Sequence, residues 1–193
     1  MPRPLFLSRR ERRLWLSAGV YTLAIYSTLA LMRRVTEFLR AQNLLRLSLG
    51  LLVLTVLAGV VWWLLRQRPS RRQWWALGGV ALGYAAVLPL AAAPEEALHL
   101  IEYGLLALLL HAALTERARR RLAESARPSW FLCHPNLTAF ALTTLAGLGD
   151  ELIQGWLPSR YYDTRDVIGN AIAGALALVA LGVVRKARTP QPV

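Results

Sequence analysis

Residues 47–65 read LSLGLLVLTVLAGVVWWLL and contain no charged side chain. A bilayer core about 30 Å thick is crossed by a helix of about 20 apolar residues. In lipid, backbone N–H and C=O groups must bond to each other, because no water is there to replace those bonds. The stretch therefore predicts a membrane-spanning α-helix.

The rest of the chain repeats this pattern. Five further apolar stretches, separated by short charged connections, cover residues 14–32, 74–93, 97–114, 137–153 and 167–184. Only 18% of the residues are charged, against about 25% in soluble domains. We predict an all-α polytopic membrane protein, a bundle of about six transmembrane helices.

The arginines predict the orientation of this bundle. With the N-terminus inside, 17 of the 23 Lys and Arg residues lie in the inner segments and six in the outer ones. Positively charged connections favour the cytoplasmic side, so we expect both termini in the cytoplasm. The net charge of +12 also suits a nucleic-acid binder, but these arginines flank apolar stretches and line no single face. We expect membrane lipids and no nucleic acid as partners.

The outer connection at residues 33–46 carries four arginines among apolar residues. This composition is typical of a short helix lying in the membrane interface. It either binds lipid phosphates or only connects two spans, and we favour the connector.

Acidic residues gather at the other outer connections. Seven of the eleven lie near the outer ends of the last three predicted spans: Glu95, Glu96, Glu102, Asp150, Glu151, Asp163 and Asp166. Ionisable groups within spans usually face one another or a wet cavity and often mark function. The sequence thus predicts one outward-facing polar cluster.

Helical spacing brings further polar side chains into this cluster. His99 and Glu102 are three residues apart and share a helix face, as do Asp150 and Gln154. Asp166, Asn170 and Gly174 form a stripe whose small residues allow a neighbouring helix to approach. The candidate ligand-binding residues are His99, Glu102, Tyr103, Asp150, Glu151, Gln154, Arg160, Asp166 and Asn170. A network that only locks the three helices together is the alternative.

The residues of this cluster say less about whether it binds a metal or carries out catalysis. His99 is its only histidine and the chain has one cysteine, Cys133, so we expect no metal and no cofactor. Neither Ser159 nor Thr164 lies in a nucleophile motif. His99 beside Glu102 is the candidate catalytic acid–base pair.

Three of these motifs together resemble the VanZ-like family of membrane proteins. They are His99-x-x-Glu102-Tyr103, then Asp150-Glu151-x-x-Gln154, then Pro158 and Arg160 followed by Asp166, Asn170 and Gly174. The resemblance makes residues 94–184 the VanZ-like membrane core, after an N-terminal three-helix region (1–93) with extra helices and before a short cytoplasmic tail (185–193). It implies a bacterial cytoplasmic (inner) membrane protein of the cell envelope. The name-giving member is linked to resistance to teicoplanin, a lipoglycopeptide antibiotic.

Three functions follow as hypotheses. The leading one is engagement of a lipid, lipid-linked molecule or lipoglycopeptide-type amphiphile through the outward-facing polar cluster. The first alternative is a membrane-embedded enzyme acting on a lipid-linked headgroup with His99 and Glu102. A transporter is the second alternative, but carriers usually place their sites near the bilayer midplane, where these spans are apolar.

Overall fold

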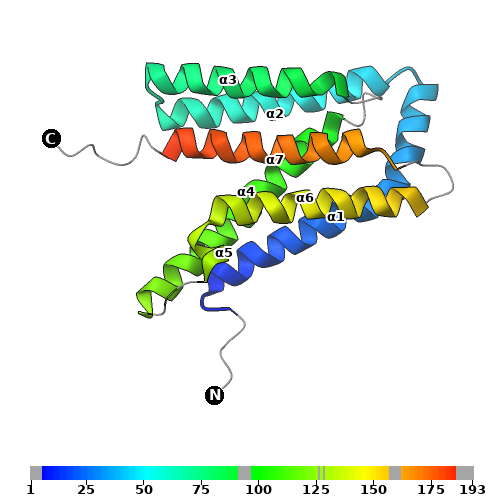
Figure 1. Cartoon of the computed structure of the whole chain (residues 1–193). Helices are drawn as coiled ribbons and strands as arrows, with labels where there is room; N and C mark the ends of the chain where they lie inside the picture. The colour runs from blue at the N-terminus through cyan, green and yellow to red at the C-terminus, as the bar shows by residue number, and fades with distance from the viewer. Residues whose placement is uncertain (1–5, 91–96, 126, 128, 157–161, 186–193) are drawn as a thin grey trace.

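The computed structural model describes residues 6–90, 97–125, 127, 129–156 and 162–185. In this part of the chain all regular secondary structure is helical, which confirms the all-α prediction. The elements, shown in Figure 1, are α1 (Arg9–Ala41), α2 (Leu45–Gln67), α3 (Arg71–Val87), the 3-10 turn η1 (Leu88–Leu90), α4 (Ala97–Ala123), α5 (Trp130–Cys133), α6 (Pro135–Trp156) and α7 (Thr164–Arg185).

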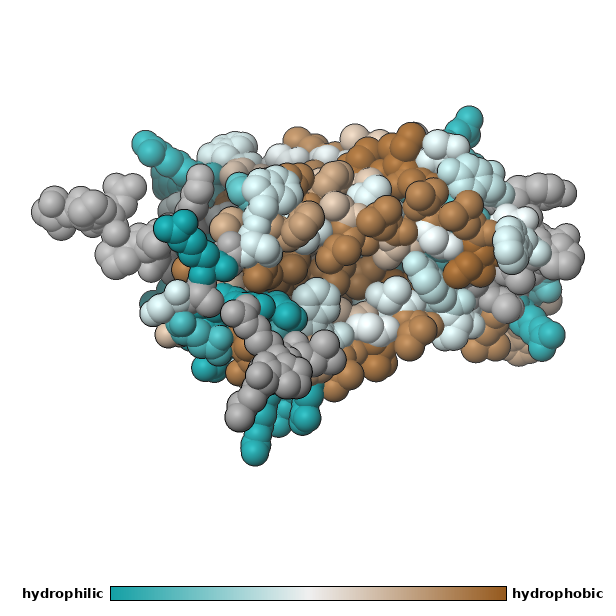
Figure 2. Space-filling model, turned by 60° about the horizontal axis from the view of Figure 1, so that its bottom comes forward, coloured by the Kyte–Doolittle hydropathy of each residue, from teal (hydrophilic) through white to brown (hydrophobic). Residues whose placement is uncertain are grey.

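Three of these helices, α2, α4 and α7, are long and apolar enough to cross a membrane. They indicate a membrane protein. The described residues of the other three predicted spans are also helical and form most of α1, α3 and α6, while residues 91–93 lie outside the described part of the chain. The space-filling view in Figure 2 shows a broad apolar band with hydrophilic residues at both ends, the surface expected of a bundle that crosses a bilayer.

The helices do not end where their apolar stretches end. α1 starts at Arg9, after Ser8, whose Oγ accepts a hydrogen bond from the Glu11 N–H at 3.0 Å. It continues through most of the predicted connection 33–46 as far as Ala41, and Figure 1 shows that its last part bends toward α2. Residues 33–41 are therefore helical, but as a continuation of α1 and not as a separate short helix.

Three other boundaries differ from the sequence expectation. α3 starts at Arg71, because Ser70 and Gln73 form a reciprocal capping box. It ends at Val87, six residues before the predicted end, where Pro89 cannot continue α-helical hydrogen bonding. α4 runs nine residues past Leu114, so the predicted inner connection begins as helix.

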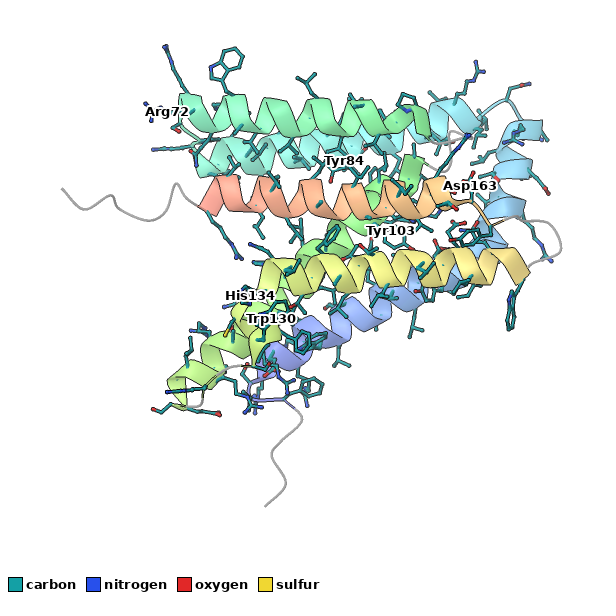
Figure 3. All side chains as sticks on the ribbon, viewed as in Figure 1. Arg72, Tyr84, Tyr103, Trp130, His134 and Asp163 are labelled. Atoms are coloured by element: carbon teal, nitrogen blue, oxygen red, sulfur yellow. The ribbon has the colours of Figure 1, made fainter. Side chains whose placement is uncertain are left out.

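α4 lies at the centre of the bundle. It packs against α7, α6 and α1. In the most apolar stretch of α4, 56% of the residues are buried, whereas none are buried in the most apolar stretch of α2. α3 packs against α7, and the Tyr84 hydroxyl of α3 donates to the Ala173 carbonyl of α7 at 2.9 Å. In Figure 3, Tyr84 lies between these two helices.

Glycines allow α6 and α7 to approach each other and α4. A Cβ on Gly174 would lie 3.1 Å from Thr143 Cγ2 and 3.6 Å from Ala107 Cβ. A Cβ on Gly147 would lie 3.1 Å from Asn170 Cβ. The small-residue stripe predicted on the last helix therefore faces its neighbours at close range.

One end of the bundle carries a network of ion pairs that the sequence analysis did not identify. Glu11 of α1 is buried and accepts from Arg117 Nη1 of α4 at 3.2 Å. Glu116 is also buried and accepts from Arg119 and Arg120. Glu116 lies beyond the apolar part of α4. Burial alone would raise the pKa of its carboxyl group, but the hydrogen bonds from Arg119 and Arg120 have the larger effect, so the net shift of the pKa is downward and the carboxylate is ionised at neutral pH.

We call this end the arginine end. Gln73 of α3 lies there, donating to the Val183 carbonyl of α7 at 2.7 Å. Asp163, before α7, lies at the opposite end, where its N–H donates to Glu151 Oε2 of α6 at 3.0 Å. Figure 3 shows the same division, with Arg72, Trp130 and His134 toward one end and Asp163 toward the other.

Candidate functional site

His99 and Glu102 form a hydrogen-bonded pair in the first turns of α4. The His99 Nδ1 and Glu102 Oε2 atoms are 2.8 Å apart. A carboxylate accepts hydrogen bonds, so this contact assigns the proton to Nδ1 and leaves Nε2 of a neutral ring as an acceptor. The spacing of three residues along a helix produces this geometry.

Tyr103 connects this pair to the interior. Its side chain is fully buried, and its ring centroid lies 6.1 Å from that of His99. Its hydroxyl is within interaction range of the Asp150 carboxylate on α6. Figure 3 shows Tyr103 between α6 and α7.

α6 contributes three buried polar side chains near its C-terminal end: Asp150, Glu151 and Gln154. Gln154 Nε2 donates to Glu151 Oε1 at 3.1 Å, and the Asp163 N–H occupies the other oxygen. Glu151 thus ties the end of α6 to the start of α7. The sequence placed Glu151 only beside the shared face, whereas the structure buries it completely.

α7 completes the cluster from its N-terminal end. Asp163 caps the helix, because its Oδ1 accepts from the Arg165 N–H at 2.8 Å. Asn170 is buried beside Gly147: a Cβ on Gly147 would lie 3.1 Å from Asn170 Cβ and 3.5 Å from Tyr103 Cε1. The charges of Asp150 and Asp166 both act on His99, which places polar groups of α4, α6 and α7 in one electrostatic neighbourhood.

The structure therefore brings eight of the nine predicted residues together: His99, Glu102, Tyr103, Asp150, Glu151, Gln154, Asp166 and Asn170. Arg160 lies outside the described residues, as do Glu95, Glu96 and Pro158.

Two further residues belong to this region and were not predicted. Tyr26 of α1 donates its hydroxyl to the Ala146 carbonyl at 2.7 Å and lies within electrostatic range of Asp150. Thr143 of α6 is buried against Gly174. Tyr26 is 120 residues from its partner, so no local pattern reveals it. Thr143 shares a helical stripe with Gly147, Asp150 and Gln154, a signal that was available.

Two buried polar atoms of the cluster, Thr143 Oγ1 and Asn170 Nδ2, have no hydrogen-bond partner within the part of the chain that the structure describes. The buried Tyr103 hydroxyl lies by the Asp150 carboxylate instead. A buried donor without a partner costs about 1–3 kcal/mol. Such groups concentrate where a protein binds water or a ligand.

Within the described ranges, no group of three or more His, Cys, Asp and Glu side chains is arranged to hold a metal ion. The chemistry that the arrangement supports is hydrogen bonding by carboxylates, an amide, phenols and an imidazole. Proton transfer at His99 is compatible with the Glu102 contact.

Comparisons with protein-family models, with curated proteins and with solved structures found no match.

Proposed function

We propose that this chain is a VanZ-like protein of the bacterial cytoplasmic membrane that engages an amphiphile through its polar cluster. In this proposal the chain spans the bilayer about six times, has both termini in the cytoplasm and exposes the cluster toward the outer leaflet. The ligand is a lipid, a lipid-linked molecule or a lipoglycopeptide such as teicoplanin.

The observation that carries the proposal is the convergence of three helices on one polar neighbourhood at one end of an apolar bundle. His99 and Glu102 come from α4, Asp150 and Glu151 from α6, and Asn170 from α7. Buried carboxylates are costly in lipid surroundings and are usually retained for function. The arginine end lies opposite, which supports the proposed orientation under the positive-inside rule.

The experiment is a ligand panel on the purified full-length chain. Lipids and lipoglycopeptides are added, and binding is followed by the shift of the thermal unfolding midpoint, since a ligand that binds the folded state stabilises it. We expect at least one class to bind and Glu102→Gln and Asp150→Asn to weaken it. Thr55→Val on the exposed α2 is the matched control, because its hydroxyl bonds to the Leu51 carbonyl of its own helix and lies outside the polar cluster. A panel in which no binding depends on Glu102 or Asp150 contradicts the proposal.

An enzyme acting on a lipid-linked headgroup is the second candidate. The observation that favours it is the 2.8 Å contact between His99 Nδ1 and Glu102 Oε2. A carboxylate that fixes the tautomer of a histidine prepares Nε2 to accept a proton from a substrate.

The enzyme hypothesis is tested by turnover. Purified protein is incubated with envelope lipids, and products are identified by mass spectrometry. His99→Ala should abolish turnover while leaving the unfolding midpoint within a few degrees of the wild type. An unaltered rate in His99→Ala would exclude this residue as the acid–base group.

A further inference from the structure

Four arginines gather at the turn between α2 and α3, at the arginine end of the bundle. They are Arg66, Arg68, Arg71 and Arg72, and all four are exposed. Only three residues separate the two helices, so the four guanidinium groups belong to one short stretch of chain. In Figure 3, Arg72 lies at the end of α3 that is far from Asp163. We call residues 66–72 the α2–α3 turn.

The positive charges of the α2–α3 turn are not neutralised by acidic side chains. Residues 38–94 contain no Asp or Glu. Within the described ranges of the chain, none of the four arginines forms an ion pair. The other half of the arginine end differs, because there Glu11 and Glu116 accept hydrogen bonds from arginines of α4. The α2–α3 turn is therefore the part of this end that suits an anion from outside the described chain.

Tryptophans lie one helical turn from two of these arginines, toward the middle of each helix. Trp62 is four residues before Arg66 on α2, and Trp75 is four residues after Arg71 on α3. Residues with this spacing share a helix face and lie about 6 Å apart along the axis. The Arg66 guanidinium lies 3.9 Å over the Trp62 ring, and both tryptophans are exposed. Because indole rings favour headgroup depth, this spacing puts both arginines near the depth of lipid phosphates.

α2 offers the surface that an acyl chain needs beside such a phosphate. Among the packed pairs of helices in the described chain, α2 occurs only with α1, and none of its most apolar stretch is buried. Exposed apolar side chains continue along it to the α2–α3 turn, among them Val61 and Leu65. A lipid against α2 would have its tail on this apolar surface and its head beside the arginines.

We propose that the α2–α3 turn binds the phosphate headgroups of anionic phospholipids while their acyl chains lie along α2. A guanidinium matches phosphate oxygens with two parallel hydrogen bonds. A zwitterionic phospholipid also carries a phosphate, but its cationic group is repelled by the unneutralised arginines, so a lipid with a net negative charge binds better. This site lies at the end opposite the polar cluster. It goes beyond the proposed function and does not depend on it.

The test measures which lipids lie next to the turn. The three tryptophans elsewhere in the full chain are first replaced: Trp15→Phe, Trp130→Phe and Trp156→Phe. The remaining fluorescence then comes from four tryptophans that flank the turn: Trp62, Trp63, Trp74 and Trp75. This chain is reconstituted in phosphatidylcholine vesicles that contain an equal mole fraction of brominated phosphatidylglycerol or brominated phosphatidylcholine. Bromine on the acyl chain quenches indole fluorescence at contact.

We expect phosphatidylglycerol to quench more strongly than phosphatidylcholine, with an enrichment beside the turn of more than about fivefold. About fivefold is the effect of one arginine near an anionic lipid surface. The same comparison in the chain with all seven tryptophans, where the other three add a constant background, gives the answer if the triple variant does not fold.

Single substitutions locate the effect. Arg66→Gln and Arg72→Gln each remove one charge from the turn and should lower the enrichment about fivefold. Arg119→Gln is the matched control, because it makes the same change of charge at the same end of the bundle. Arg119 lies on α4 and already donates to Glu116, so its replacement should leave the enrichment beside the turn unchanged.

Three results would overturn the proposal. Equal quenching by the two brominated lipids would show no preference for negative charge. A loss in Arg119→Gln as large as in Arg72→Gln would show attraction to the total charge of the chain, without a site at the turn. Quenching by neither lipid would show that protein, such as a second copy of the chain, covers these tryptophans. Ligand binding that depends on Glu102 or Asp150 is measured separately, so the proposed function stands or fails independently.

Discussion

Replacing Arg117 should destabilise the protein more than replacing Glu11, although the two residues form one ion pair at the arginine end. The Glu11 side chain is 0% exposed, and its oxygens accept from Arg117 Nη1 at 3.2 Å and from the Leu7 N–H at 2.7 Å. The Arg117 side chain is 28% exposed. Only the carboxylate, therefore, has no access to water.

This asymmetry sets the magnitudes. Arg117→Met leaves a buried carboxylate with a single neutral donor, and removing one partner of a buried pair costs about 3–5 kcal/mol. Glu11→Gln keeps an oxygen for Leu7 and leaves Arg117 partly hydrated, so we expect about 1–2 kcal/mol, the range of one lost hydrogen bond to a charged group.

The assay is thermal unfolding in detergent, followed by circular dichroism. For a chain of this size, 1 kcal/mol corresponds to about 2–4 °C in Tm, so Arg117→Met should melt several degrees below Glu11→Gln. Arg119→Met is the control: its side chain is 63% exposed and shares Glu116 with Arg120, so we expect less than about 1 kcal/mol. Equal losses for Glu11→Gln and Arg117→Met, or the reverse order, would refute the argument from burial.

Three further predictions concern other parts of the bundle. Tyr84→Phe should lower the unfolding free energy by about 1 kcal/mol, because it removes the hydrogen bond from the Tyr84 hydroxyl to the Ala173 carbonyl; an unfolding midpoint equal to that of the wild type would contradict this. Gly174→Val should cost about 1–3 kcal/mol by forcing α6 and α7 apart, while Gly182→Val, where a Cβ meets nothing within 4 Å, should be tolerated, and equal melting of both variants would speak against close packing at Gly174. Cys133 is exposed on α5 near the arginine end. Because the proposed orientation puts this end in the cytoplasm, Cys133 should react with a membrane-impermeant maleimide in inside-out vesicles and not in intact cells; labelling in intact cells would contradict the proposed orientation.

Local patterns in the sequence anticipated those features that depend on a single helix. The spacing of His99 and Glu102 predicted that they share a helix face, and their side chains are in contact. The order of the motifs along three consecutive helices then indicated that their polar ends share one side. Each of these inferences needs only helical periodicity and alternation across a bilayer.

Contacts between distant segments were not accessible in the same way. Glu11 and Arg117 are 106 residues apart, and nothing near either residue specifies the other. The predicted end of α4 was also wrong, because the helix continues past its apolar stretch. Residues 115–123 are mostly Ala, Arg, Leu and Glu, which favour helix without being apolar, so hydropathy alone ended α4 too early.

The slight burial of α2 has a consequence for how this helix responds to its surroundings. Its 23 residues span about 35 Å at 1.5 Å per residue, which exceeds a hydrocarbon thickness of about 30 Å. With so few protein neighbours to hold it, its inclination is governed by acyl-chain length and by the tryptophans near its end. Thinner membranes should therefore tip α2 further over while the α4–α6–α7 assembly keeps its geometry.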